Sequence, residues 1–98
     1  MLPSEPIWLN QEHGHRVVKA EPMVRNSQAD GSYTSDRRVV CAILTADCMP
    51  LFLTDRLGST VCLLHIGWRG LSAGIIEKGL DVLNIEPQIM QQIKVNLR

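Results

Sequence analysis

A strand–turn–strand–helix pattern occupies residues 51–83, which read LFLTDRLGSTVCLLHIGWRGLSAGIIEKGLDVL. Residues 51–53 predict one strand, and the aliphatic, partly β-branched run Thr60–Ile66 predicts the next. The turn formers of Asp55–Ser59 lie between them. Apolar residues at helical spacing then predict one amphipathic helix over Leu71–Leu83. We therefore expect an antiparallel hairpin followed by a helix that packs against it.

Weaker patterns flank this region. The continuous apolar run Val39–Leu44 predicts a buried strand, and Arg16–Ala20 predicts a short one. Asn26–Ser32 is rich in turn formers. Pro87 suits the start of a second helix that runs to about Ile93. Together these elements predict an α/β (α+β) fold, in which helices pack on a mixed β-sheet core.

The hairpin has a consequence for two residues that can bind metal. A tight turn centred on residues 56–57 would pair Cys48 directly with His65 on the neighbouring strand. A longer turn would shift this register slightly and still leave both side chains at one edge of the sheet. We therefore expect Cys48 and His65 to lie close together.

Composition limits the class of protein. The chain has 98 residues, 45% of them hydrophobic, and no formal net charge. Such a length allows one domain at most, here residues 1–98. The hydrophobic content excludes disorder of the whole chain, and the neutral charge argues against binding to nucleic acid or anionic lipid. With no membrane span and no secretion signal in the sequence, we expect a cytoplasmic protein, whose three cysteines do not suggest a disulfide framework.

A metal site is the chemistry that these residues favour. Thiolate sulfur and imidazole nitrogen are ligands that zinc and copper prefer, which suits Cys48 and His65. A third ligand, His13, can come from the polar loop at residues 11–15. Asp47 can orient a ligand histidine. Arg69, near the expected helix start, can hold an anion such as phosphate.

Structural roles are the alternative for the same residue types. A free cysteine is most often a small buried hydrophobic residue, and we expect that role for Cys41 and Cys62. Trp68 is expected in the core or in a pocket wall, and His15 in solvent. A cysteine hydrolase, with Cys48 as nucleophile and His65 as base, is a further alternative.

Four sequence strings resemble one protein family. They are WLNQEHG at residues 8–14, ADG at 29–31, LTADCMP at 44–50 and HIGWRGLSAGIIE at 65–77. In this order they resemble the bacterial polyphenol oxidase (laccase-domain) family, which is also described as multifunctional purine nucleoside phosphorylases. The resemblance implies an α/β sandwich with a single zinc or copper ion held by two histidines and one cysteine.

Matching the motifs assigns site residues. The resemblance makes His13, Cys48 and His65 the metal ligands, with Zn²⁺ as the cofactor and Cu²⁺ as the alternative. It makes these three residues and Arg69 the catalytic set, with Arg69 near the substrate or the phosphate. The implied reaction is phosphorolysis of purine nucleosides such as adenosine, inosine and guanosine, together with adenosine deamination and methylthioadenosine cleavage.

Two other functions stay open within this resemblance. One is copper-dependent oxidation of polyphenols, which a single Cys/His₂ site suits less well than phosphorolysis. The other follows from length, because family domains are more than twice as long as this chain. A truncated member can keep the metal ligands, lack part of the substrate pocket and associate with a second copy as an inactive homo-oligomer.

Overall fold

The computed structural model describes residues 4–46, 48–83 and 94–95. In these ranges the strands of the larger sheet follow the order β2 (Val17–Lys19), β3 (Gly31–Thr34), β6 (Val61–Ile66), β5 (Met49–Thr54) and β7 (Lys94–Val95). β2 runs parallel to β3, whereas the other neighbours are antiparallel. The sheet is therefore mixed, as expected.

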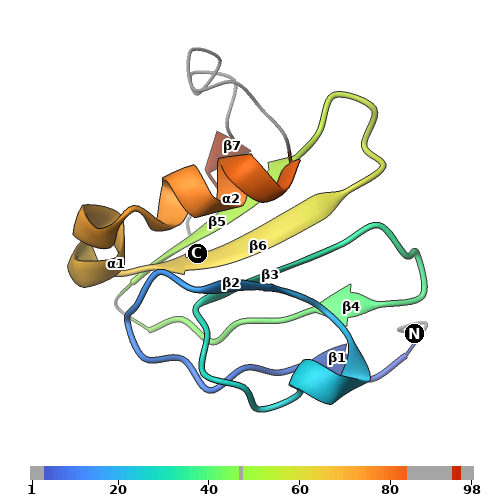
Figure 1. Ribbon diagram of the computed structural model, residues 1–98, viewed down its shortest axis with the longest axis horizontal. Coiled ribbons are helices and arrows are strands. Elements are labelled where there is room, and N and C mark those ends of the chain that lie inside the picture. Colours follow the sequence, from blue (N-terminus) through green and yellow to red (C-terminus); the bar gives the residue numbers. More distant parts are fainter. Residues whose placement is uncertain (1–3, 47, 84–93, 96–98) are drawn as a thin grey trace.

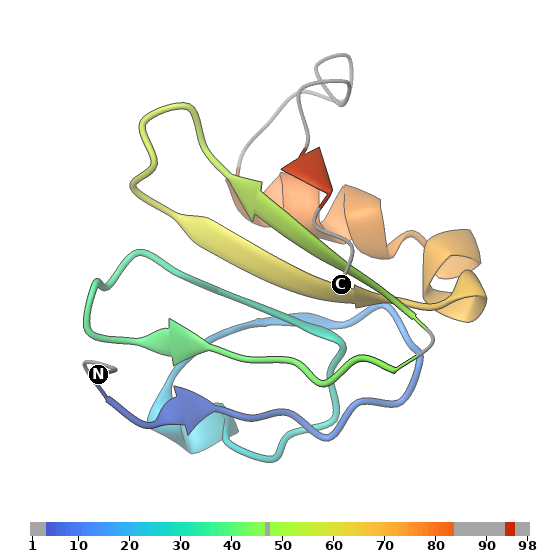
Figure 2. The same cartoon turned by 180° about the vertical axis from the view of Figure 1, so that it is seen from behind.

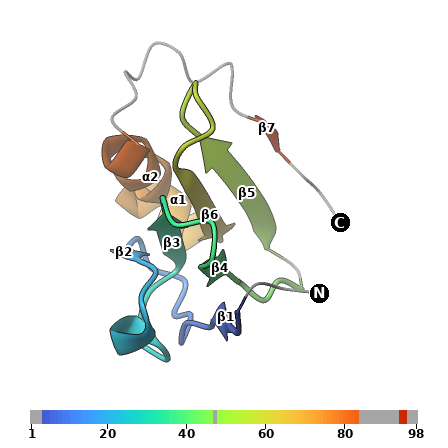
Figure 3. The same cartoon turned by 90° about the vertical axis from the view of Figure 1, so that its right-hand side faces the viewer.

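The remaining elements lie around this sheet. They are the parallel pair β1 (Pro6–Ile7) and β4 (Val40–Cys41), the 3₁₀ turn η1 (Pro22–Val24), and the helices α1 (Trp68–Ala73) and α2 (Ile75–Leu83). The helices cover one side of β5 and β6 (Figure 3). The β1–β4 pair lies beyond β2 and β3, at the bottom of Figure 1. This arrangement confirms the predicted fold class.

The main core lies between the helices and the sheet. Side chains alternate along a strand, so every second residue of β5 and β6 points toward the helices. These residues are Leu51, Leu53, Cys62, Leu64 and Ile66, which pack with Ile75, Leu80 and Leu83 of α2. A Cβ at Gly79 would lie 2.9 Å from Leu64 and 3.0 Å from Leu53. The glycine therefore lets α2 approach the sheet closely.

The single helix predicted over Leu71–Leu83 was wrong. Two helices form, because Gly74 adopts a left-handed conformation with φ +95° and ends α1. Its backbone N–H donates to the carbonyls of Gly70 and Leu71. Leu71, an apolar residue at the start of the predicted helix, is half exposed. The predicted helix from Pro87 to Ile93 lies outside the described residues.

The hairpin is in a different register from the expected one. β5 and β6 lie side by side (Figure 2), and His65 is paired with Pro50 rather than with Cys48. The turn is longer than predicted, because the Asp55 carboxylate accepts the backbone N–H of Ser59 and stabilises a longer loop. Cys48 consequently lies just before β5. It still reaches the sheet edge where His65 is placed.

Two strand predictions also need correction. The expected strand Val39–Leu44 forms only at Val40–Cys41 and is half buried rather than buried. In contrast, β3 was not predicted: it begins at Gly31, inside the segment Asn26–Ser32 that was interpreted only as a turn. β2 confirms the strand expected over Arg16–Ala20. Among the described helices, none is long and apolar enough to cross a membrane.

Candidate metal centre

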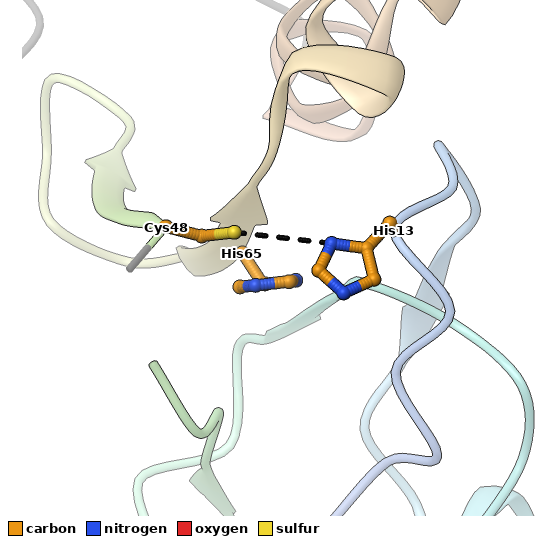
Figure 4. Close-up of side chains that lie close together, drawn as sticks. All are labelled: His13, Cys48 and His65. Carbon is orange, nitrogen blue, oxygen red and sulfur yellow. Dashed lines mark hydrogen bonds between the residues drawn. The ribbon is translucent and has the colours of Figure 1, made fainter. Parts of the chain in front are cut away.

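Three separate segments bring His13, Cys48 and His65 together (Figure 4). His65 lies near the end of the central strand β6 and is only 4% exposed. Cys48 immediately precedes the neighbouring strand β5 and is half buried. His13 comes from the loop between β1 and β2 and is exposed. The predicted cluster therefore forms, with one buried, one half-buried and one exposed member.

The distances suit a single metal ion. One ligand atom from each residue lies within 4.8 Å of the others. Cys48 Sγ is 3.8 Å from His13 Nδ1, and the two imidazole rings meet edge to face with centroids 5.1 Å apart. Sulfur and nitrogen bound to one tetrahedral zinc ion are separated by about 3.5 Å, given ordinary Zn–S and Zn–N bond lengths. Cys48 and His13 are thus already close to that separation.

Gly67 leaves room for this cluster. A Cβ at this position would lie 3.1 Å from His13 Nδ1 and 3.4 Å from Cys48 Sγ. A side chain at this position would crowd His13 Nδ1 and would touch Cys48 Sγ. The donor set of one sulfur and two nitrogens is also one that zinc and copper prefer. The residues present therefore fit a metal ion of this class, whose identity the donor set does not distinguish.

Asp30 lies directly behind the cluster. Its side chain is fully buried, and Oδ2 lies 2.7 Å from Nδ1 of His65. The same carboxylate accepts the backbone N–H groups of Glu12, His13 and Gly14 at 2.9–3.0 Å. Burial alone would raise the pKa of Asp30. The hydrogen bonds from His65 and from the three backbone amides outweigh burial and hold that pKa below its ordinary value.

Sequence reasoning missed Asp30 as a site residue. The carboxylate meets His65 because β3, which begins at Gly31, pairs with β6, and β3 was not predicted. The ADG string at residues 29–31 was part of the family resemblance and was the available signal. Asp47, which was expected in this supporting role, lies outside the described residues.

Two further contacts hold the ligand-bearing loops together. The Gln11 side chain donates to the carbonyl of Leu44 and accepts its N–H, both at 2.7 Å. This links the His13 loop to the segment that leads to Cys48. A Cβ at Gly70 would lie 2.5 Å from the carbonyl oxygen of Gly14, so the glycine allows the His13 loop to touch α1.

A pocket of about 750 Å³ opens beside the cluster and includes His13 and Cys48 in its wall. The rest of its lining is mostly apolar, with Met49, Ile66, Trp68 and Leu71 alongside Arg69. Trp68 is 77% exposed, so it is a pocket-wall residue and not a core residue. The Arg69 guanidinium lies 5.8 Å from the centre of the Trp68 ring. The pocket thus combines an aromatic surface, a cation and two candidate ligands.

The other cysteines differ from Cys48. Cys62 is fully buried as predicted, and burial raises the pKa of its thiol to about 12. Burial also raises the pKa of Cys41, which is half buried rather than fully buried. Because thiolates are the form that binds metal, a raised pKa disfavours both as ligands. His15 is exposed, as expected.

Comparison with known proteins identifies the family of this chain. A family model described as "Multi-copper polyphenol oxidoreductase laccase" matches residues 1–97. The chain belongs to this family. Its members in the comparison include purine nucleoside phosphorylase YfiH of Escherichia coli, which is 43% identical over 89 residues. Another is purine nucleoside phosphorylase PA4543 of Pseudomonas aeruginosa, 45% identical over 84 residues.

The match covers most of this chain but a smaller share of its relatives. It spans 89% of this chain and 36% of the E. coli family member, and 86% and 34% for the P. aeruginosa one. The chain therefore corresponds to about a third of these relatives.

Solved structures show the same fold. The Neisseria meningitidis protein NMB0706 superimposes with a TM-score of 0.76 at 37% identity, over 88% of this chain and 35% of that one. YlmD of Geobacillus stearothermophilus gives a TM-score of 0.68 at 28% identity, over 78% of this chain and 33% of its own. The sheet and helices described above thus match about a third of each of these structures.

Proposed function

We propose that this chain is the metal-binding part of a purine nucleoside phosphorylase. The observation that carries the proposal is the convergence of His13, Cys48 and His65, with ligand atoms within 4.8 Å of one another, beside a pocket that contains Arg69. Family members with about 40% identity that bear this activity in their names support it. We further propose that residues 1–98 form one partial domain and that the protein acts in the cytoplasm.

The pocket contains groups that suit both expected substrates, a purine nucleoside and phosphate. The exposed face of Trp68 and the apolar side chains of Met49 and Leu71 offer a surface on which a planar purine can stack. Arg69 carries a permanent positive charge and a planar set of donors that match phosphate. α1 has only six residues, so the guanidinium, rather than the helix dipole, is the main attraction for an anion.

Phosphorolysis then requires little covalent chemistry from the protein. An oxygen of phosphate bonds to C1′ of the ribose, and the bond from C1′ to the base nitrogen breaks. The base leaves with the electron pair and takes up a proton, which gives free base and ribose 1-phosphate. Arg69 orients the phosphate, and its positive charge partly neutralises the negative charge of the phosphate. His13, Cys48 and His65 would hold a metal ion, which supplies Lewis-acid polarisation when bound.

Metal analysis tests the site directly. We expect about one zinc ion per purified chain, retained after dialysis, and loss of that zinc in Cys48→Ala, His65→Gln and His13→Gln. Cys41→Ala and His15→Gln remove the same residue types elsewhere and should retain it. Zinc content that is unchanged in Cys48→Ala would show that the site is assigned wrongly.

Activity is tested on the same preparations. With inosine or adenosine and inorganic phosphate, release of free base should depend on phosphate and disappear in Cys48→Ala and in Arg69→Ala. Deamination of adenosine and cleavage of methylthioadenosine are finer proposals, which the same assay tests by product identification. A zinc-loaded chain without turnover would support the alternative that this chain is an inactive truncated member.

Two alternatives have distinct readouts. Copper-dependent oxidation of phenols is suggested by the family's description, and it predicts oxygen uptake with a phenol after copper loading. Within the described residues, one group of potential ligands, His13, Cys48 and His65, could hold a metal ion, which favours single-metal chemistry. A cysteine hydrolase would be inactivated by alkylation of Cys48 and would stay fully active after metal removal.

A further inference from the structure

One buried carboxylate contacts the segments that carry both histidines of the cluster. Asp30 has no exposed surface, and its two oxygens accept four hydrogen bonds from the protein. One of these comes from the His65 ring, and the other three come from the loop that carries His13. No other carboxylate among the described residues is as completely buried.

The contact with His65 determines which ring nitrogen faces the cluster. Asp30 Oδ2 lies 2.7 Å from Nδ1 of His65, and an ionised carboxylate accepts hydrogen bonds but cannot donate them. Nδ1 must therefore carry the proton. In the neutral ring, Nε2 is then left with a free lone pair, which is the form that binds a metal ion. The backbone adds to this alignment, because the N–H of His65 donates to the carbonyl of Asp30 at 2.7 Å.

The contact with the loop determines where His13 lies. Three successive backbone amides, those of Glu12, His13 and Gly14, converge on the same carboxylate at 2.9–3.0 Å. Successive amides of this kind form an anion-binding concavity. His13 itself has φ +60°, a left-handed backbone conformation that is unfavourable for residues other than glycine. The carboxylate thus compensates for a strained backbone that projects the His13 ring toward Cys48.

We propose that Asp30 is the positioning residue of the metal centre: it selects the metal-binding tautomer of His65 and holds the loop that presents His13. This inference rests on the metal site proposed above and adds a residue to it. Removing the negative charge of Asp30 should disturb both imidazole ligands at once. A buried residue with a merely structural role would change stability without changing the tautomer of one histidine.

Asp30→Asn tests the proposal with almost no change in side-chain shape. We expect the ¹⁵N shifts of the metal-free wild-type protein, in mildly alkaline buffer, to show His65 protonated at Nδ1. In Asp30→Asn the population should move toward the Nε2-protonated form. Zinc affinity, measured by competition with a chelator, should weaken roughly 10- to 100-fold. The control is Asp36→Asn, which alters an exposed carboxylate in a turn and should leave both readouts unchanged.

The outcomes separate this inference from the proposed function. If the wild-type protein binds no zinc but the tautomer responds to Asp30→Asn, the metal site is wrong and the positioning of His65 is supported. Zinc affinity of Asp30→Asn within twofold of wild type overturns the inference. If Asp30→Asn does not fold, the wild-type spectrum decides: a proton on Nε2 of His65 overturns the inference, and a proton on Nδ1 supports it.

Discussion

At the scale of single residues, Gly67 has a role that depends on space and not on backbone freedom. Its φ of −101° and ψ of 171° are open to any residue. A Cβ at this position would nevertheless approach His13 Nδ1 to 3.1 Å and Cys48 Sγ to 3.4 Å. The absence of a side chain at Gly67 therefore keeps two ligand atoms free to converge.

Gly67→Ala should weaken zinc binding by about tenfold and change the unfolding free energy by less than about 1 kcal/mol. The matched control is Gly58→Ala in the hairpin loop. Gly58 has φ +69° and open space around its Cβ position, so the substitution strains the backbone by about 1 kcal/mol and leaves zinc affinity intact. Calorimetric titration and chemical denaturation measure the two effects. Zinc affinity that is unchanged in Gly67→Ala but weakened in Gly58→Ala would contradict this role for Gly67.

At the scale of elements, the metal centre depends on how loops attach to the sheet. Only His65 lies within a long strand, whereas Cys48 and His13 lie in connecting segments. Gln11 joins those two segments, because its amide group forms a pair of 2.7 Å hydrogen bonds with the backbone of Leu44. The Gln11 side chain thereby satisfies the backbone of Leu44 as a neighbouring strand would. Leu44 lies in the part of the expected strand Val39–Leu44 that does not form a strand.

Gln11→Ala should lower zinc affinity several-fold and destabilise the fold by about 1–2 kcal/mol, since two hydrogen bonds to the backbone are lost. Gln28→Ala is the control, because Gln28 is exposed and its bridge to Asn10 is a backbone interaction. Chelator competition and urea denaturation give the two values. Equal zinc affinities for Gln11→Ala and Gln28→Ala would mean that the Gln11 link does not position Cys48.

At the scale of the whole molecule, the two faces of the sheet differ. Leu51, Leu53 and Leu64 point toward the helices and are buried. Phe52 and Leu63 pair across β5 and β6 on the opposite face, where Phe52 is 37% exposed and Leu63 is half buried. The chain also spans only about a third of the length of its relatives. We therefore expect the chain alone to associate through this face.

Phe52→Lys should shift the molecular mass measured by light scattering toward that of the monomer, because it places a charge in the expected apolar contact. Leu57→Lys makes an equivalent change at the hairpin tip, where Leu57 is 90% exposed, and should leave the mass unchanged. A wild-type chain that is a compact and stable monomer at high concentration would contradict the prediction of self-association.

Much of the fold could be predicted because its patterns are local. The alternation in β5 and β6 and the helical spacing of Ile75, Leu80 and Leu83 are visible within a few residues. The break at Gly74 was missed, since a glycine inside a helical pattern can be tolerated and does not by itself mark the end of a helix. The register was missed because it depends on the side chain of Asp55, which lengthens the loop.

The sequence by itself determined the hairpin, the helical face and, through its motifs, the identity of His13, Cys48 and His65 as a candidate metal set. Only the tertiary structure decided that Asp30 supports this set, that Gln11 ties its loops and that Trp68 faces a pocket. The physical reason is separation along the chain. Asp30 and His65 are 35 residues apart and meet because β3 lies beside β6, a pairing that no local periodicity specifies.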